Sequence, residues 1–138
     1  MSLERNKAAI RAFVDAVNQR DWERLDELVS PGFVRHSRAA PRVSTLDELK
    51  RYLRSEFEIF PDAVETIEDL VAEGDRVAVR HLFTGTQLGP MGPYPASGRV
   101  MEAQYLAIYR LSNGLVAESW AEWDNLDGLA QLGHYPGP

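Results

Sequence analysis

The sequence contains no cysteine and no long apolar segment. Without thiols, the chain has no disulfide framework, no thiolate nucleophile and no cysteine-based zinc site. No stretch approaches the roughly 20 consecutive apolar residues of a membrane-spanning helix, and residues 1–19 are too charged for a secretion signal. We therefore expect a cytoplasmic protein with no membrane partner.

Positive charge is also scarce, because 15 lysines and arginines stand against 21 aspartates and glutamates, for a net charge of −6. Nucleic-acid binding requires clustered positive charge, so we expect no nucleic-acid partner. His36, His81 and His134 lack the short spacings, such as His-x-x-x-His, that are typical of metal ligands. We expect no metal and no organic cofactor.

The residues that are present suit one globular domain covering residues 1–138. Hydrophobic residues make up 44% of the chain and charged residues 26%, as in ordinary globular proteins. A Gly/Pro-rich interval, residues 85–98, is expected to be a loop within the domain. Met91 and Tyr94 are unusual in a purely solvated connection, so residues 87–98 form either a lid over a cavity or a dimer contact.

Helical periodicity dominates the first half of the chain. Apolar residues recur at helical spacing over Leu3–Gln19, which predicts an amphipathic helix. Asp21 is a suitable N-cap for a second, short helix that ends before Pro31. Thr45–Glu48 fits a capping box, which predicts a third helix that continues to Pro61.

The second half changes to the two-residue period of β-strands. Residues 73–75 and Asn113-Gly114 are turn signals, and Asn-Gly supplies the positive φ angles of a tight hairpin. The predicted strands are Ala63–Ala72, Arg76–Thr86, Val100–Leu111 and Leu115–Trp123. The expected fold class is α+β, an antiparallel sheet with the helices on one face, and strong bending of the sheet would leave a cavity between the layers.

The last predicted strand places three carboxylates and an indole on one face. Glu118, Trp120, Glu122 and Asp124 share one parity. Alternation alone favours solvent for this face, where the carboxylates only aid solubility. The alternative is a concave, partly dry face, where desolvation raises a carboxylate pKa.

Several segments together resemble a known family. They are Glu73–Arg80, Thr84–Thr86, Arg110–Gly114, Glu118-x-Trp120, Asp124 and Gln131–Gly133. Their order over nearly the whole chain is similar to that of the SnoaL-like polyketide cyclases, which have the cone-shaped fold of the nuclear-transport-factor-two-like superfamily. The closing Glu-x-Trp-x-x-x-Asp with Gln-Leu-Gly is the most specific part.

This resemblance implies a function for the face that carries Asp124. In cyclases of the family an aspartate deep in the cavity is the acid/base of an intramolecular aldol closure, and Asp124 matches its position. The resemblance therefore favours the pocket over solvent for this face. It also implies a small, largely apolar carbonyl substrate and a homodimer formed through the open face of the sheet, for which Leu106 and Tyr109 are suitable exposed apolar residues.

Other residues are candidates for the remaining parts of the site. His36, which resembles a pocket residue of the family, is a catalytic candidate with Asp124, although a solvated loop histidine is as consistent with the sequence. His81 is either a pocket residue or a satisfied core histidine. Hydrogen-bond donors for a developing enolate and residues lining the cavity are expected among Arg35, His36, His81, Gln104, Tyr105, Phe13, Phe33 and Trp120.

Other activities remain open at the level of the sequence. An isomerase, a dehydratase or an epoxide hydrolase could use the same fold, the last with Asp69, Arg80 and Asp124 as its relay. A function of a different class is a dimeric module that binds a small apolar ligand without turnover. Gln104 and Tyr105 point to opposite faces of their strand, so at most one of them is expected in the pocket.

Overall fold

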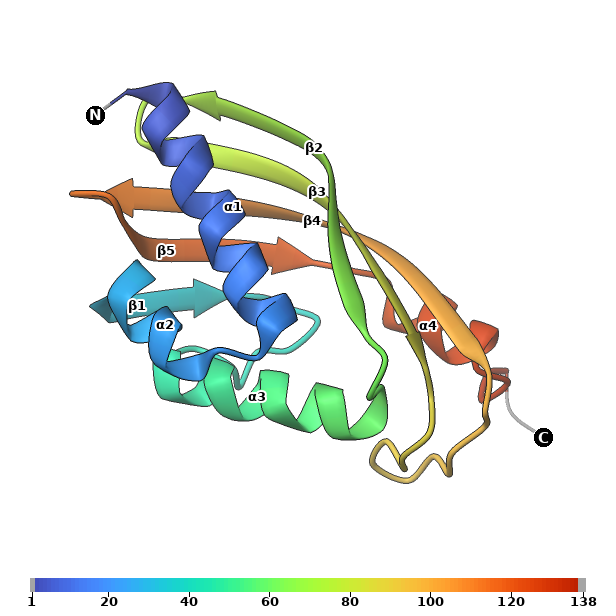
Figure 1. The fold of residues 1–138 in the computed structure, drawn as a ribbon. Coiled ribbons are helices and arrows are strands. Elements are labelled where there is room, and N and C mark those ends of the chain that lie inside the picture. The colour runs from blue at the N-terminus through green and yellow to red at the C-terminus, as the bar shows by residue number, and fades with distance from the viewer. Residues whose placement is uncertain (1, 137–138) are drawn as a thin grey trace.

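A computed structural model describes residues 2–136, with one curved sheet covered by helices on one face (Figure 1). In this part of the chain the elements are α1 (Leu3–Gln19), α2 (Trp22–Leu28), β1 (Val29–His36), α3 (Leu46–Ile59), β2 (Val64–Glu73), β3 (Arg76–Thr86), β4 (Val100–Ser112), β5 (Leu115–Glu122) and α4 (Asn125–Gln131). The predicted α+β class is confirmed. Among the described residues, no helix has both the length and the apolar character needed to cross a membrane.

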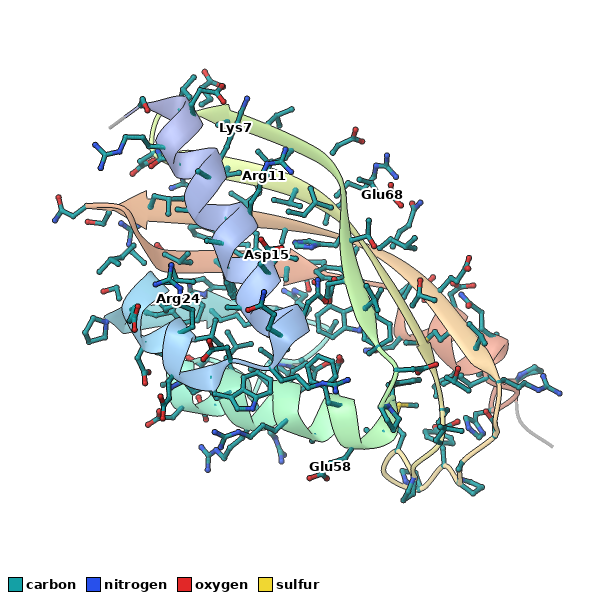
Figure 2. All side chains as sticks on the ribbon, in the orientation of Figure 1. Lys7, Arg11, Asp15, Arg24, Glu58 and Glu68 are labelled. Carbon is teal, nitrogen blue, oxygen red and sulfur yellow. The ribbon has the colours of Figure 1, made fainter. Side chains whose placement is uncertain are left out.

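α1 has the predicted bounds, and α2 and α3 begin where their capping residues predict. The Asp21 side chain accepts the Arg24 backbone N–H at the start of α2. Thr45 and Glu48 form the predicted capping box of α3, in which each side chain accepts a backbone N–H of the other residue. Polar side chains such as Arg11 lie on the outward face of α1 (Figure 2), which leaves its apolar face to the sheet.

The sheet has the strand order β1-β5-β4-β3-β2. The hairpins β2–β3 and β4–β5 are antiparallel, as predicted. Gly74 has a φ of 58°, and Asn113 and Gly114 have φ values of 51° and 81°. These positive angles close both hairpins with the residue types that tolerate them.

Two elements were not expected from the sequence. One is β1, which pairs parallel to β5 at the edge of the sheet with a register shift between Val29 and Val34. Pro31 and Gly32 lie within this shift, where proline is tolerated because the strand is at an edge, and they hide the strand in the sequence. The other is α4, seven residues long, whose periodicity is too short to predict a helix.

The main core lies between α1 and the inner face of the sheet, the face that the helices cover. Ile10, Val77 and Val116 are fully buried there. A second, smaller core closes the other end of the sheet, where Leu132, which follows α4, packs with Phe60. A cavity remains between the helices and the curved sheet.

The register of β5 decides which of its side chains face this cavity. A shift opposite Arg110 and Leu111 interrupts the pairing of β4 with β5, so Val116, Ser119 and Ala121 are all buried on the inner face. The other side chains of the strand, including Glu118 and Trp120, therefore lie on the outer face. The face preference drawn from alternation alone agrees with the structure, and the pocket placement implied by the resemblance does not.

Candidate active site

The cavity has a volume of about 120 Å³ and is bounded by α1, α3 and the inner faces of the strands. An apolar cavity of roughly 150 Å³ admits one benzene ring, so the space is comparable to a single ring. Its apolar lining includes Phe13, Phe33, Leu49, Leu53, Phe83, Met101 and Trp123. Its polar lining includes Arg35, Tyr52, Glu56, Glu65, His81, Tyr105, Tyr109 and Ser119.

Glu65 on β2 and His81 on β3 form the polar centre of this lining. Glu65 Oε2 lies 3.7 Å from His81 Nδ1, and the two side chains are 14% and 1% exposed. Among the described residues, neither of these two atoms has a hydrogen-bond partner. A pair of buried polar atoms without partners is uncommon, and here both atoms belong to residues that line the cavity.

The environment of Glu65 keeps its carboxyl protonated at neutral pH. Burial raises the pKa of Glu65 to about 8, and the nearby Glu56 carboxyl adds to the rise. The Tyr105 hydroxyl donates to Glu65 Oε1 over 2.8 Å and opposes the rise in pKa because it stabilises the charged form. Glu65 is therefore a carboxyl that gains and loses a proton near the working pH of an enzyme.

His81 is held neutral in a fixed orientation. Burial lowers its pKa to about 4. Its ring stacks on Tyr105 with centroids 4.3 Å apart, and its Nε2 is 2.9 Å from the Tyr109 hydroxyl. These two contacts direct Nδ1 toward Glu65.

Another group of polar side chains in the cavity comes from β1 and α3. Burial raises the pKa of Glu56, against the opposing effects of the Tyr52 hydroxyl and the Arg35 guanidinium. Burial likewise raises the pKa of Tyr52. The Arg35 guanidinium is 5.5 Å from the centre of the Trp123 ring.

The two residues predicted to be catalytic lie outside the cavity lining. Asp124 is exposed and is the N-cap of α4, where it accepts the Asp127 backbone N–H over 3.0 Å. His36 is on the outer face of β1, stacked on Trp120, and its Nε2 is 2.7 Å from Glu118 Oε2. The side chains of β1 alternate, so Arg35 points inward where His36 points outward.

The predicted substrate-binding residues divide between the two faces. Phe13, Phe33, His81 and Tyr105 line the cavity. Gln104 is exposed on the outer face of β4, which resolves the choice between Gln104 and Tyr105 in favour of the tyrosine. Trp120 is on the outer face of β5, not in the cavity, and the tryptophan that lines the cavity is Trp123.

The two acidic residues of the cavity, Glu56 and Glu65, were missed in the sequence. Glu56 follows Leu49 and Leu53 at helical spacing. A carboxylate within this apolar stripe was the feature of the sequence that could have identified it. Glu65 was harder to find because a register shift between Ile67 and Asp69 reverses the parity of β2. Asp69 and Arg80, suggested for an epoxide-hydrolase relay, form an exposed ion pair 2.7 Å long.

Comparison with known proteins gives consistent results. A profile of the SnoaL-like polyketide cyclases matches residues 7–132. IdmH from Streptomyces antibioticus, a candidate polyketide cyclase, is 30% identical with a TM-score of 0.85, covering 93% of this chain and 98% of its own. TsrD from Streptomyces laurentii is 30% identical with a TM-score of 0.84, covering 96% and 98%.

A third solved structure carries a different description. AclR from Streptomyces galilaeus, a candidate hydroxylase, is 25% identical with a TM-score of 0.86, covering 98% of this chain and all of its own. The search of curated protein sequences gave no match. Within residues 2–136, no three histidine, aspartate or glutamate side chains gather as metal ligands would.

Proposed function

Because the chain belongs to the SnoaL-like polyketide cyclase family, we propose that it is a cofactor-independent enzyme for intramolecular aldol closure of a small, largely apolar carbonyl compound. The observation that carries this proposal is the pair of unpartnered atoms, Glu65 Oε2 and His81 Nδ1, in an apolar cavity. A carbonyl substrate supplies the oxygen that such a pair lacks.

In the proposed reaction Glu65 moves the proton in both directions. The ionised carboxylate removes a proton from the carbon next to one carbonyl group, and the electrons of the C–H bond form an enolate. The enolate carbon bonds to a second carbonyl carbon of the same molecule, whose oxygen becomes an alkoxide. The alkoxide takes the proton back from Glu65, so the step consumes no co-reactant. A pKa of about 8 suits both transfers near neutral pH.

His81 supplies a hydrogen bond to the substrate oxygen in this scheme. We assign the Tyr109 hydroxyl as the donor to His81 Nε2, which leaves the proton of the neutral imidazole on Nδ1. Nδ1–H then donates to the oxygen on which the enolate charge develops. A fixed donor aimed at developing charge in a water-poor site contributes several kcal/mol to catalysis.

The test compares Glu65→Gln with Asp124→Asn, the variant that removes the acid/base implied by the family resemblance. Both changes keep the side-chain shape and remove a carboxylate. On a panel of β-keto esters, epoxides and enones, we expect Glu65→Gln to lose about 100-fold or more of the turnover of any accepted substrate. Asp124→Asn should retain it, because asparagine also caps helices.

The opposite outcome identifies the other residue. Loss of turnover in Asp124→Asn with full activity in Glu65→Gln would assign the proton transfers to Asp124. The accepted substrate separates aldol closure from isomerase, dehydratase and epoxide-hydrolase chemistry. A binding module predicts no turnover on any substrate, with ligand-dependent thermal stabilisation alone.

The same proposal includes a homodimer formed through the outer face of the sheet. Leu106 and Ile108 on β4 and Val34 on β1 are 65%, 42% and 40% exposed there. Opposite Leu106 and Ile108 on β5 are Glu122 and Trp120, and tryptophan is among the residues that are enriched at interfaces. Tyr109, the other residue predicted for this contact, is 8% exposed and faces the cavity. Its expected exposure was wrong because it has the inward parity of β4.

A further inference from the structure

Arg35 is the one lysine or arginine among the described residues that line the cavity. It lies on β1 and is 8% exposed. A guanidinium stays charged at any ordinary pH, and burying such a charge is costly unless an opposite charge or hydrogen-bond acceptors compensate it. The position therefore requires an explanation.

Its contacts within the protein are few and long. Nη1 donates to the carbonyl oxygens of Ala40 and Val43 over 3.4 and 3.3 Å. Among residues 2–136, no hydrogen bond reaches Nε or Nη2, and no carboxylate lies within 4.0 Å of the guanidinium. The side of the guanidinium formed by Nε–H and Nη2–H is left without an acceptor.

Among the described residues, neither carboxyl group of the cavity forms an ion pair with this charge. Burial raises the pKa of both Glu56 and Glu65, which disfavours the charged form of each carboxyl group. The guanidinium is thus a positive charge without an ion-pair partner among the described residues of the cavity. An apolar cavity with that charge favours a ligand with one negative group.

We infer that the substrate of this cavity carries a carboxylate and that Arg35 binds it through Nε–H and Nη2–H. These two parallel donors match the two oxygens of a carboxylate. An enolate or phenolate has only one charged oxygen and cannot accept from both donors in this way. The inference rests on the proposed function, because it assigns the substrate class of the same cavity. Arg35 then orients the substrate, while Glu65 and His81 act on its carbonyl group.

The test uses binding of an unreactive pair, cinnamate and cinnamamide, which have nearly the same shape and differ in charge. Isothermal titration near neutral pH measures both affinities for the wild type, Arg35→Met, Arg35→Lys and Arg38→Met. We expect the wild type to prefer cinnamate by roughly tenfold or more, as for a charge-assisted hydrogen bond. Arg35→Met should lose that preference and keep its affinity for cinnamamide, and Arg35→Lys should keep part of it.

Arg38→Met is the matched control. It removes the same charge three residues away, from an exposed loop position that lines only the outer hollow beside β1, and should keep the full preference. Equal affinities for the two probes in the wild type, no binding of cinnamate, or an unchanged preference in a folded Arg35→Met protein would each overturn the inference. Circular dichroism checks folding, and Arg35→Lys keeps the test valid if Arg35→Met does not fold.

The same measurements separate this inference from the proposed function. Glu65→Gln should keep the preference for cinnamate, because it leaves Arg35 in place. A preference that depends on Arg35 in a protein without turnover would support the carboxylate site and reject the proposed chemistry. Turnover that depends on Glu65, without any preference for cinnamate, would support the proposed chemistry and reject the carboxylate site.

Discussion

His81 and Tyr105 stack face to face, with ring centroids 4.3 Å apart and ring planes inclined by 10°. The Tyr105 hydroxyl also donates to Glu65 Oε1, while His81 Nδ1 faces Glu65 Oε2. The two stacked rings thus reach the two oxygens of one carboxyl group. This arrangement holds Oε1 by a hydrogen bond and leaves Oε2 buried without a hydrogen-bond partner among the described residues.

The protonated state of Glu65 predicts a pH dependence of stability. Its pKa is about 8 in the folded protein, above the ordinary 4.5. Between these values the folded protein holds a proton that the unfolded chain has lost, so the free energy of unfolding falls as the pH rises. His81, with its pKa lowered from 6.5 to about 4, has the opposite effect at lower pH. The effect of Glu65 is therefore best isolated between pH 6.5 and 8.

Glu65→Gln should make the free energy of unfolding less dependent on pH in that interval, by up to about 1 kcal/mol per pH unit. Urea unfolding at several pH values measures the difference. Glu68→Gln, which changes an exposed residue of the same strand (Figure 2), should behave as the wild type. Parallel declines in the wild type and Glu65→Gln would mean that Glu65 is ionised in the folded protein.

The capping role of Asp124 predicts different results for two substitutions. Asp124→Ala removes the acceptor for the Asp127 N–H and should lower the free energy of unfolding by about 1 kcal/mol. Asp124→Asn keeps an acceptor oxygen and should change the free energy of unfolding by only a few tenths of a kcal/mol or less. Urea unfolding of both variants tests this. Equal destabilisation would show that the charge, and not the cap, is what the fold uses.

The loop of residues 87–98 is attached to the end of α3. The N–H groups of Leu88 and Gly89 both donate to the Ile59 carbonyl oxygen, and a Cβ at Gly89 would lie 2.6 Å from the Glu58 carbonyl oxygen. Gly89→Ala should therefore destabilise the protein by about 1–3 kcal/mol. Gly32→Ala, where a Cβ meets nothing within 4 Å, is the control. Equal melting temperatures for the two variants would indicate a loop that moves freely.

The dimer proposal predicts that a charge on the outer face of the sheet separates the subunits. Leu106→Glu places a carboxylate at a position that is 65% exposed in the single chain, and burying it in an interface is unfavourable. Sedimentation velocity should find a wild-type dimer and a Leu106→Glu monomer. Leu88→Glu, at an exposed position of the 87–98 loop, should remain dimeric. A monomeric Leu88→Glu with a dimeric Leu106→Glu would assign the interface to the loop.

The sequence was sufficient to predict most of the fold because its signals are local. The capping box at Thr45 and the Asn113-Gly114 turn depend on neighbouring residues, and both were predicted correctly. The edge strand β1 was missed because its parallel pairing with β5 joins distant segments. Pro31 and Gly32 also interrupt the alternating pattern by which a strand is recognised in the sequence.

The site was less predictable because register shifts decide which side chains face inward. One shift in β2 brings Glu65 to the cavity, and another between β4 and β5 separates the inward parity of Val116 from that of Ser119 and Ala121. A strand parity counted from the sequence fails beyond each shift. His81 lies on β3, whose burial alternates without interruption, and the sequence correctly placed it on the apolar face of its strand.

A final prediction concerns the hydrogen bond between Tyr105 and Glu65. The Tyr105 hydroxyl lowers the pKa of Glu65 from what burial alone would produce, because it donates to the ionised carboxylate. Tyr105→Phe keeps the ring that stacks on His81 and removes this donor. The pKa of Glu65 should therefore rise above its wild-type value. Carbon-13 NMR of the glutamate carboxyl groups, with Glu65→Gln to assign the signal, measures the change.

Tyr109→Phe is the matched control, because its hydroxyl contacts His81 and not Glu65. Its Glu65 pKa should lie nearer to the wild-type value than that of Tyr105→Phe does. Turnover should fall, since His81 loses the hydroxyl that keeps the imidazole proton on Nδ1. In Tyr105→Phe the rising part of the pH–rate profile should instead move to higher pH, together with the pKa of Glu65. An unchanged profile in a variant whose Glu65 pKa has risen would show that Glu65 is not the base.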